Sequence, residues 1–74
     1  MAKKKYQFSG ERILELRLKR GFSRTQFAAS LNKSDVTLER YELGRGRPNV
    51  HVLAEIAQKL HVHPGDFFVE DGRR

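Results

Sequence analysis

The chain has 74 residues, which is enough for one domain with a small hydrophobic core. It contains no cysteine, so disulfides and thiolate metal sites are excluded, and a reducing cytoplasm is expected. No apolar segment approaches membrane-spanning length, and the basic start lacks the apolar stretch of a signal peptide. The net charge of +6 and the isoelectric point near 10.2 indicate a polyanionic partner, usually a nucleic acid.

Residues 1–8 are interpreted as a basic arm because Lys3, Lys4 and Lys5 form a run. Such a run is either a solvated terminus or a contact for a polyanion, and both interpretations remain open. A first helix is then expected over residues 9–20, with Ser9 as its N-cap and an apolar stripe that includes Ile13 and Leu16.

Residues 23–44 read as two short capped helices joined by a tight turn. Ser23 and Gln26 have the spacing of a capping box. Asn32 tolerates the left-handed conformation that a sharp turn needs, and Ser34 can cap the next helix. Gly44 ends that helix. This arrangement is what a helix-turn-helix requires.

A fourth helix is predicted to begin after Asn49 and to end at His61, because apolar residues recur there at helical spacing. Residues 64–68 read as a short fifth helix, and residues 70–74 as a flexible tail. No segment has the alternation of a strand. The predicted domain therefore covers residues 9–69 and is all-α.

The stretch from 23 to 44 resembles the helix-turn-helix of the phage repressor and Cro family, also called the XRE or lambda-repressor-like family. The residues that carry the resemblance are Ser23, Phe27, Ala28, Leu31, Ser34, Thr37, Leu38, Tyr41, Glu42 and Gly44, followed by Arg-Gly-Arg-Pro. Matching positions on both sides extend the resemblance over roughly residues 10 to 68. It implies a compact five-helix domain that binds double-stranded DNA as a transcriptional regulator, typically a cytoplasmic repressor of bacterial or phage origin.

The resemblance also implies roles for individual residues. The base-reading positions correspond to Asp35, Val36 and Arg40, with Glu39 ranked below them. Arg17 and Glu42 match a pair that is buried between two helices in several relatives. The residues expected to contact DNA phosphates are Arg24, Ser34, Thr37, Arg45, Arg47, Lys3, Lys4 and Lys5.

Two acids on the outward face of the third helix depart from an ordinary DNA-reading surface. Asp35 has an equally good interpretation as compensation of the helix dipole. Glu39 could instead orient Arg40 or another arginine. The alternative functions are a protein-interaction module on the same fold, such as an antitoxin or adaptor, and the DNA-binding domain of a longer regulator. A homodimer on a palindromic operator is also expected, because one small helix-turn-helix reads few bases.

Catalysis, cofactors and metals are not expected. The sequence has no cysteine nucleophile and no glycine-rich phosphate loop. His61 and His63 lie close in sequence, but they lack further ligands at suitable spacing, and His51 lies in the fourth helix. We therefore predict a binding domain that is not an enzyme and that needs no cofactor or metal.

Overall fold

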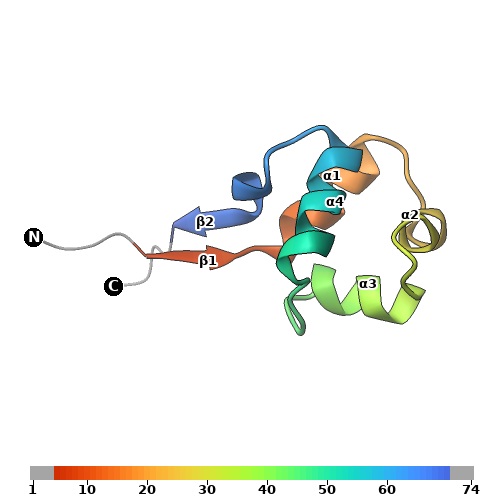
Figure 1. Cartoon of the computed structure of the whole chain (residues 1–74), viewed down its shortest axis with the longest axis horizontal. Helices are drawn as coiled ribbons and strands as arrows, with labels where there is room; N and C mark the ends of the chain where they lie inside the picture. The colour runs from red at the N-terminus through yellow and green to blue at the C-terminus, as the bar shows by residue number, and fades with distance from the viewer. Residues whose placement is uncertain (1–4, 71–74) are drawn as a thin grey trace, which may run out of the picture.

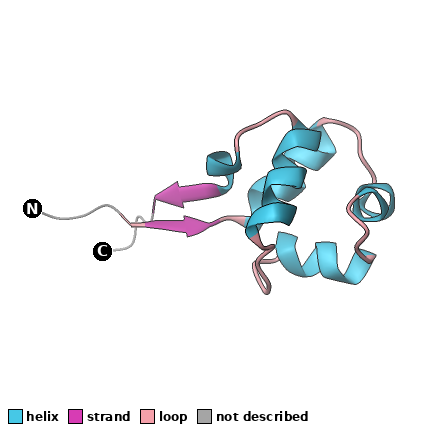
Figure 2. Cartoon of the chain, viewed as in Figure 1, coloured by secondary structure: helices cyan, strands magenta, loops and turns pink. Residues whose placement is uncertain are grey.

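The computed structural model describes residues 5–70 and places four α-helices beside a two-stranded sheet (Figures 1 and 2). The helices pack together as one body, and the sheet projects from one end of it. The elements in chain order are β1 (Tyr6–Phe8), α1 (Gly10–Lys19), α2 (Arg24–Ser30), α3 (Asp35–Glu42), α4 (Val50–Leu60), the 3₁₀ helix η1 (Pro64–Phe67) and β2 (Phe68–Glu70).

The prediction of a fifth α-helix is wrong, because the element after α4 is the four-residue 3₁₀ helix η1. Pro64 fixes the first backbone angle of this turn. The carboxylate of Asp66 accepts a hydrogen bond from the backbone N–H of His63 at 3.1 Å, which closes the turn locally. A single tight turn is sufficient to bring Phe67 into the core, where its side chain is fully buried.

The expectation of no strands is also wrong. β1 and β2 pair antiparallel, with Tyr6 opposite Glu70 and Phe8 opposite Phe68. Three-residue strands are too short to display an alternating pattern, and their pairing joins positions about sixty residues apart. Residues 6–8 of the expected arm and residue 70 of the expected tail therefore pair in this sheet, which we call the ribbon. Lys3, Lys4 and residues 71–74 lie outside the described residues.

The hydrophobic core draws on all four α-helices and on η1. Ile13, Phe27, Leu38 and Ile56 come from successive helices, and each is at most 1% exposed. The remaining core residues are Ala28, Leu31, Leu53, Ala57, Leu60 and Phe67. Because Leu38 is completely buried, the rotation of α3 about its axis is fixed. The opposite side of α3 consequently faces solvent.

The turn between α2 and α3 follows the local signals in the sequence. The hydroxyls of Ser23 and Ser34 each accept from the backbone N–H three residues later, at 3.1 Å in both cases. Among the described residues, no side-chain bond returns from Gln26 to complete the capping box. Asn32 adopts φ 58°, as expected for the turn. Ser9 precedes α1 in an extended conformation but makes no side-chain cap bond.

A glycine allows α1 to approach α3 closely. A Cβ built on Gly10 would lie 1.7 Å from the backbone carbonyl oxygen of Tyr41, so only glycine fits at this point. The contact joins the first turn of α1 to the last turn of α3. It therefore sets how far the carboxyl end of α3 stands from the rest of the domain.

Candidate nucleic-acid interface

The solvent-facing side of α3 carries the residues that the resemblance selects for base reading. Asp35, Val36, Glu39 and Arg40 are all exposed, and Val36 is 65% exposed despite being apolar. Leu43, at the end of the helix, is 57% exposed on the same side. Burial of Leu38 is the cause, since it turns these positions outward together. The structure thus brings the four predicted positions onto one accessible face.

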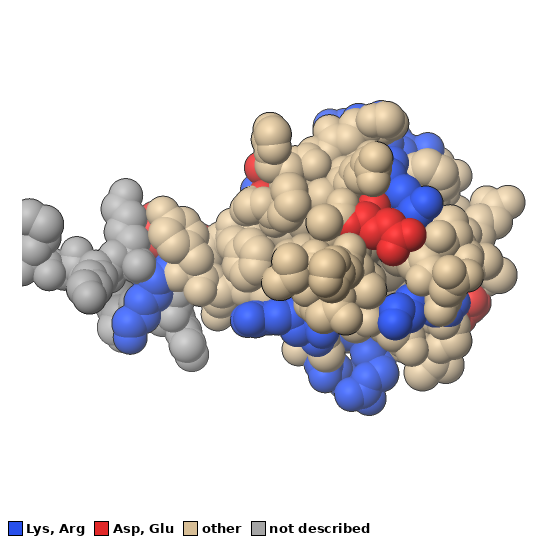
Figure 3. Space-filling view, viewed as in Figure 1, with Lys and Arg blue, Asp and Glu red and all other residues tan. Residues whose placement is uncertain are grey.

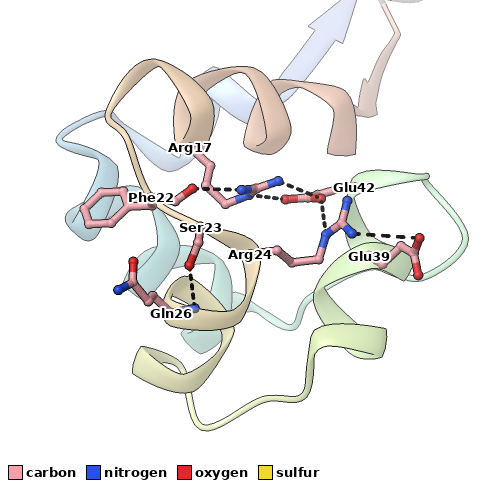
Figure 4. A network of polar contacts seen from close by, with 7 residues as sticks. All are labelled: Arg17, Phe22, Ser23, Arg24, Gln26, Glu39 and Glu42. Carbon is pink, nitrogen blue, oxygen red and sulfur yellow. Dashed lines mark hydrogen bonds and ion pairs between the residues drawn. The ribbon is translucent and has the colours of Figure 1, made fainter.

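Arg17 and Glu42 lie together beneath this face (Figure 4). Arg17 Nε donates to Glu42 Oε2 at 2.7 Å, and Nη2 lies 3.5 Å from Oε1. The Arg17 side chain is 5% exposed and that of Glu42 is 1% exposed. A third contact, from Arg17 Nη1 to the carbonyl oxygen of Phe22 at 2.8 Å, ties the pair to the segment before α2. The pair therefore joins α1, the start of α2 and α3.

Arg24, expected to contact a phosphate, lies against carboxylates of its own chain. Its Nε donates to Glu42 Oε1 at 3.1 Å, and its Nη1 lies 4.0 Å from Glu39 Oε2 (Figure 4). The Arg24 side chain is 38% exposed and that of Glu39 is 50% exposed. Glu42 is thus shared between two arginines. Arg24 is thus bonded within the chain while more than a third of its side chain stays exposed.

Asp35 has a partner on α2 that the sequence analysis did not select. Thr25 Oγ1 donates to Asp35 Oδ2 at 2.6 Å, and both residues are exposed. Short hydrogen bonds of this kind are typical of a hydroxyl that donates to an ionised carboxylate. No local pattern connects positions ten residues apart on different helices. Only the packing of α2 against α3 reveals this contact.

Arg40 makes no salt bridge with the acids of the described residues. Of the two arginine contacts left open for Glu39, with Arg40 or with another arginine, the structure therefore shows the second. Arg40 Nη2 lies 3.4 Å from the carbonyl oxygen of Arg45, in the loop after α3. Glu39 is instead nearest to Arg24. The guanidinium of Arg40 therefore retains most of its donors for an outside partner.

The remaining described basic residues expected to contact phosphates lie in the loop after α3 or beside the ribbon. Arg45 is exposed in the loop after α3. The guanidinium of Arg47 lies 5.9 Å from the ring centre of Phe8 and 6.0 Å from that of Phe68, so the ribbon holds it by cation–π contacts. Lys5 is exposed immediately before β1. Figure 3 shows lysine and arginine side chains along the lower edge of the molecule, where α3 and its following loop lie in Figure 1.

The two hydroxyls expected to contact phosphates are bonded to each other. Ser34 Oγ lies 3.1 Å from Thr37 Oγ1 and also accepts from the Thr37 backbone N–H. These contacts form the cap of α3. Each hydroxyl still has an unused lone pair, so neither is prevented from meeting an outside group.

The three histidines do not form a metal site with neighbouring acids. Within residues 5–70, no group of three metal-ligating side chains from His, Cys, Asp and Glu converges. His61 has φ 59° and ends α4 in the left-handed conformation. In the same part of the chain, no helix has both the length and the apolar character needed to cross a bilayer.

A capped α2, a short turn and a capped α3 with an exposed outer face define a helix-turn-helix domain. A family model described as Helix-turn-helix matches residues 13–67. The chain belongs to this XRE-type helix-turn-helix family.

A relative from Pyrococcus furiosus, named as a candidate HTH-type transcriptional regulatory protein, is 40% identical over 65 residues. The match covers 84% of this chain but 21% of the relative, so the chain spans about a fifth of that protein. No solved structure gives a significant match.

Proposed function

We propose that this domain binds double-stranded DNA sequence-specifically and serves as the DNA-binding part of a transcriptional regulator. In this proposal α3 enters the major groove and α2 crosses the backbone above it. The observation that carries the proposal is the accessible face of α3, where Arg40 pairs with no acid of residues 5–70 and lies beside a basic loop. Family membership and the name of the Pyrococcus furiosus relative support the same function.

Three side chains on this face supply complementary chemistry for base edges. Arg40 can donate to the O6 and N7 atoms of guanine, which is the commonest specific contact in the major groove. Val36 offers an apolar surface to a thymine methyl group. Asp35 accepts from the N4 amino group of cytosine. Glu39 takes no base in this proposal, because it lies toward Arg24.

The phosphate contacts come from side chains around α3. Arg45, Arg47 and Lys5 are the described candidates, and Lys3 and Lys4 would extend this set along the backbone. Ser34 and Thr37 add neutral hydrogen bonds at the start of α3. Arg24 contributes less than the sequence suggests, since its guanidinium is already bonded to Glu42 and lies near Glu39.

We further propose repression by a homodimer on a palindromic operator. A single helix-turn-helix of this size contacts too few bases to find one site in a genome. Two copies related by a twofold axis would read half-sites about 34–36 Å apart on one face of the duplex. A footprint that covers a single half-site, without cooperativity, would contradict this arrangement.

A second candidate function is a protein-interaction module, as in an antitoxin or adaptor. The specific observation that favours it is the pair of acids on the exposed face of α3, Asp35 and Glu39. A basic partner would match them. Mutation of Arg40 or Asp35 would then abolish a protein complex and leave DNA binding unchanged.

The deciding experiment is selection of bound sites from a random duplex library, followed by affinity measurements at several salt concentrations. If Arg45, Arg47 and Lys3–Lys5 neutralise about five phosphates, log K should fall against log salt with a slope near −4.5. Replacement of the three lysines by glutamine should reduce the slope to about −2 and leave the selected sequence unchanged. If the selection enriches no sequence, sequence-specific recognition is refuted. If the salt slope of the glutamine variant is unchanged, the three lysines do not contact DNA.

A further inference from the structure

The two acids on the exposed face of α3, Asp35 and Glu39, each lie against a residue of α2, and these two α2 residues are consecutive. Thr25 binds Asp35 at 2.6 Å, and Arg24 lies 4.0 Å from Glu39. Asp35 and Glu39 are one helical turn apart, so the two contacts form adjacent links between α2 and α3. Before any ligand binds, Asp35 is therefore hydrogen-bonded to α2, and Glu39 lies within ion-pair distance of it.

The contact between Thr25 and Asp35 leaves part of the carboxylate available. Thr25 Oγ1 occupies Oδ2, while no hydrogen bond within the described residues involves Oδ1. Threonine is branched at Cβ, which restricts the direction in which its hydroxyl can point. The carboxylate is thus oriented with one oxygen fixed toward α2 and the other free to accept a hydrogen bond.

The position of the Arg24 side chain is set by the buried carboxylate of Glu42. Its Nε is bound to Glu42, whose side chain is only 1% exposed and is itself held by Arg17. With Nε anchored, Nη1 draws Glu39 toward α2. Arg40, the next residue along α3, is left without a carboxylate partner among the described residues.

We propose that Thr25 and Arg24 are positioning residues that determine which bases this domain selects. Thr25 aims the free oxygen of Asp35 at a cytosine amino group. Arg24 withdraws Glu39 from Arg40, so that Arg40 can read guanine. The inference rests on the proposed function, and it assigns to α2 a role in base selection that does not require either residue to touch a base.

The Thr25 arm of the proposal is tested by a double-mutant cycle on the selected operator. Affinities are measured for the operator, for a duplex in which the cytosine under Asp35 is changed, and for random DNA. Thr25→Val should reduce discrimination at that cytosine about tenfold, which is within the range for one good base contact. Random-duplex affinity should stay within about twofold. In a D35A background, Thr25→Val should have no further effect.

A matched control is Ser30→Ala. This change removes another α2 hydroxyl, which donates to the carbonyl of Phe27 at 2.7 Å and, within residues 5–70, has no hydrogen bond to either acid. It should leave discrimination at the cytosine unchanged. If Thr25→Val weakens every duplex equally, also in the D35A background, Thr25 is a phosphate contact and its positioning role is refuted.

The Arg24 arm is tested by rescue. Arg24→Gln should reduce discrimination for the guanine under Arg40 several-fold, because Glu39 is then free to approach Arg40. Adding Glu39→Gln should restore discrimination, whereas Glu39→Gln alone should change it little. Failure of the second change to rescue the first would mean that Arg24 acts directly on DNA.

The design separates failure of this inference from failure of the proposed function. A wild-type protein that selects no sequence refutes both. If the wild-type protein selects a sequence and the D35A variant discriminates at every base as well as the wild type does, the role of Thr25 alone is refuted. Specific binding that persists unchanged in all these variants refutes the whole inference and leaves the proposed function standing.

Discussion

Glu42 is predicted to matter more for stability than Arg17, although they form one ion pair. Glu42→Met would leave the guanidinium of Arg17 in a site where it is 5% exposed, with the carbonyl of Phe22 as its one partner in the described part of the chain. Stranding a buried charge in this way typically costs about 3–5 kcal/mol. Arg17→Met would leave Glu42 still bound to Arg24 at 3.1 Å. We therefore expect that change to cost less, about 2 kcal/mol, because the remaining carboxylate keeps a charged hydrogen bond.

The double variant is the informative one. With both groups replaced by methionine, no charge of the pair remains buried, and such replacements are often neutral or stabilising. We expect its free energy of unfolding to lie within about 2 kcal/mol of the wild-type value. The loss in the double variant would then be well below the sum of the two single losses.

Urea unfolding followed by circular dichroism measures all three values. A domain of 74 residues has a total stability of about 4–11 kcal/mol, so unfolding of Glu42→Met is best measured at low temperature or in a stabilising osmolyte. Equal losses for the two single variants would refute the support that Arg24 gives to Glu42. Additive losses in the double variant would refute coupling between Arg17 and Glu42.

Arg40→Ala should cost about 1–3 kcal/mol on the selected operator and little on random DNA, whereas equal weakening on both in a binding assay would make it a phosphate contact. Gly10→Ala should cost more than about 3 kcal/mol in urea unfolding, because its Cβ would lie 1.7 Å from the Tyr41 carbonyl oxygen. Gly65→Ala meets nothing within 4 Å and should stay within about 0.5 kcal/mol, so equal losses at the two glycines would refute the close approach. Arg47→Gln should reduce the salt slope by about one without altering the selected sequence, and an unchanged slope would exclude Arg47 from the DNA interface.

The parts of the fold that the sequence predicted correctly depend on interactions between near neighbours. The serine caps of α2 and α3 each bind a backbone N–H three residues away. The left-handed turn at Asn32 and the helix end at Gly44 follow from the conformational freedom of those residues. Apolar spacing correctly identified Ile13 as an inward residue of the first helix.

The features that the sequence did not predict arise from contacts between distant positions. The ribbon pairs strands of three residues, whose periodicity is too brief to detect. The bond between Thr25 and Asp35 depends on how α2 and α3 cross, which no local pattern records. The contacts of Arg24 also depend on the packing of α2 against α3. The resemblance indicates a phosphate contact at its position, but the structure places its side chain between Glu39 and Glu42. Family resemblance thus located the face of α3 but not the partners of its acids.

The ribbon also determines how this domain can be joined to another. Because Tyr6 is paired with Glu70, polypeptide added before the first strand or after the second would leave from the same place. That place lies at the end of the molecule opposite α2 (Figure 1). A fused domain on either side would therefore share one attachment point, remote from the helix-turn-helix. The domain could be inserted within a loop of a host protein as readily as it could be appended to either of its ends, with the face of α3 left uncovered.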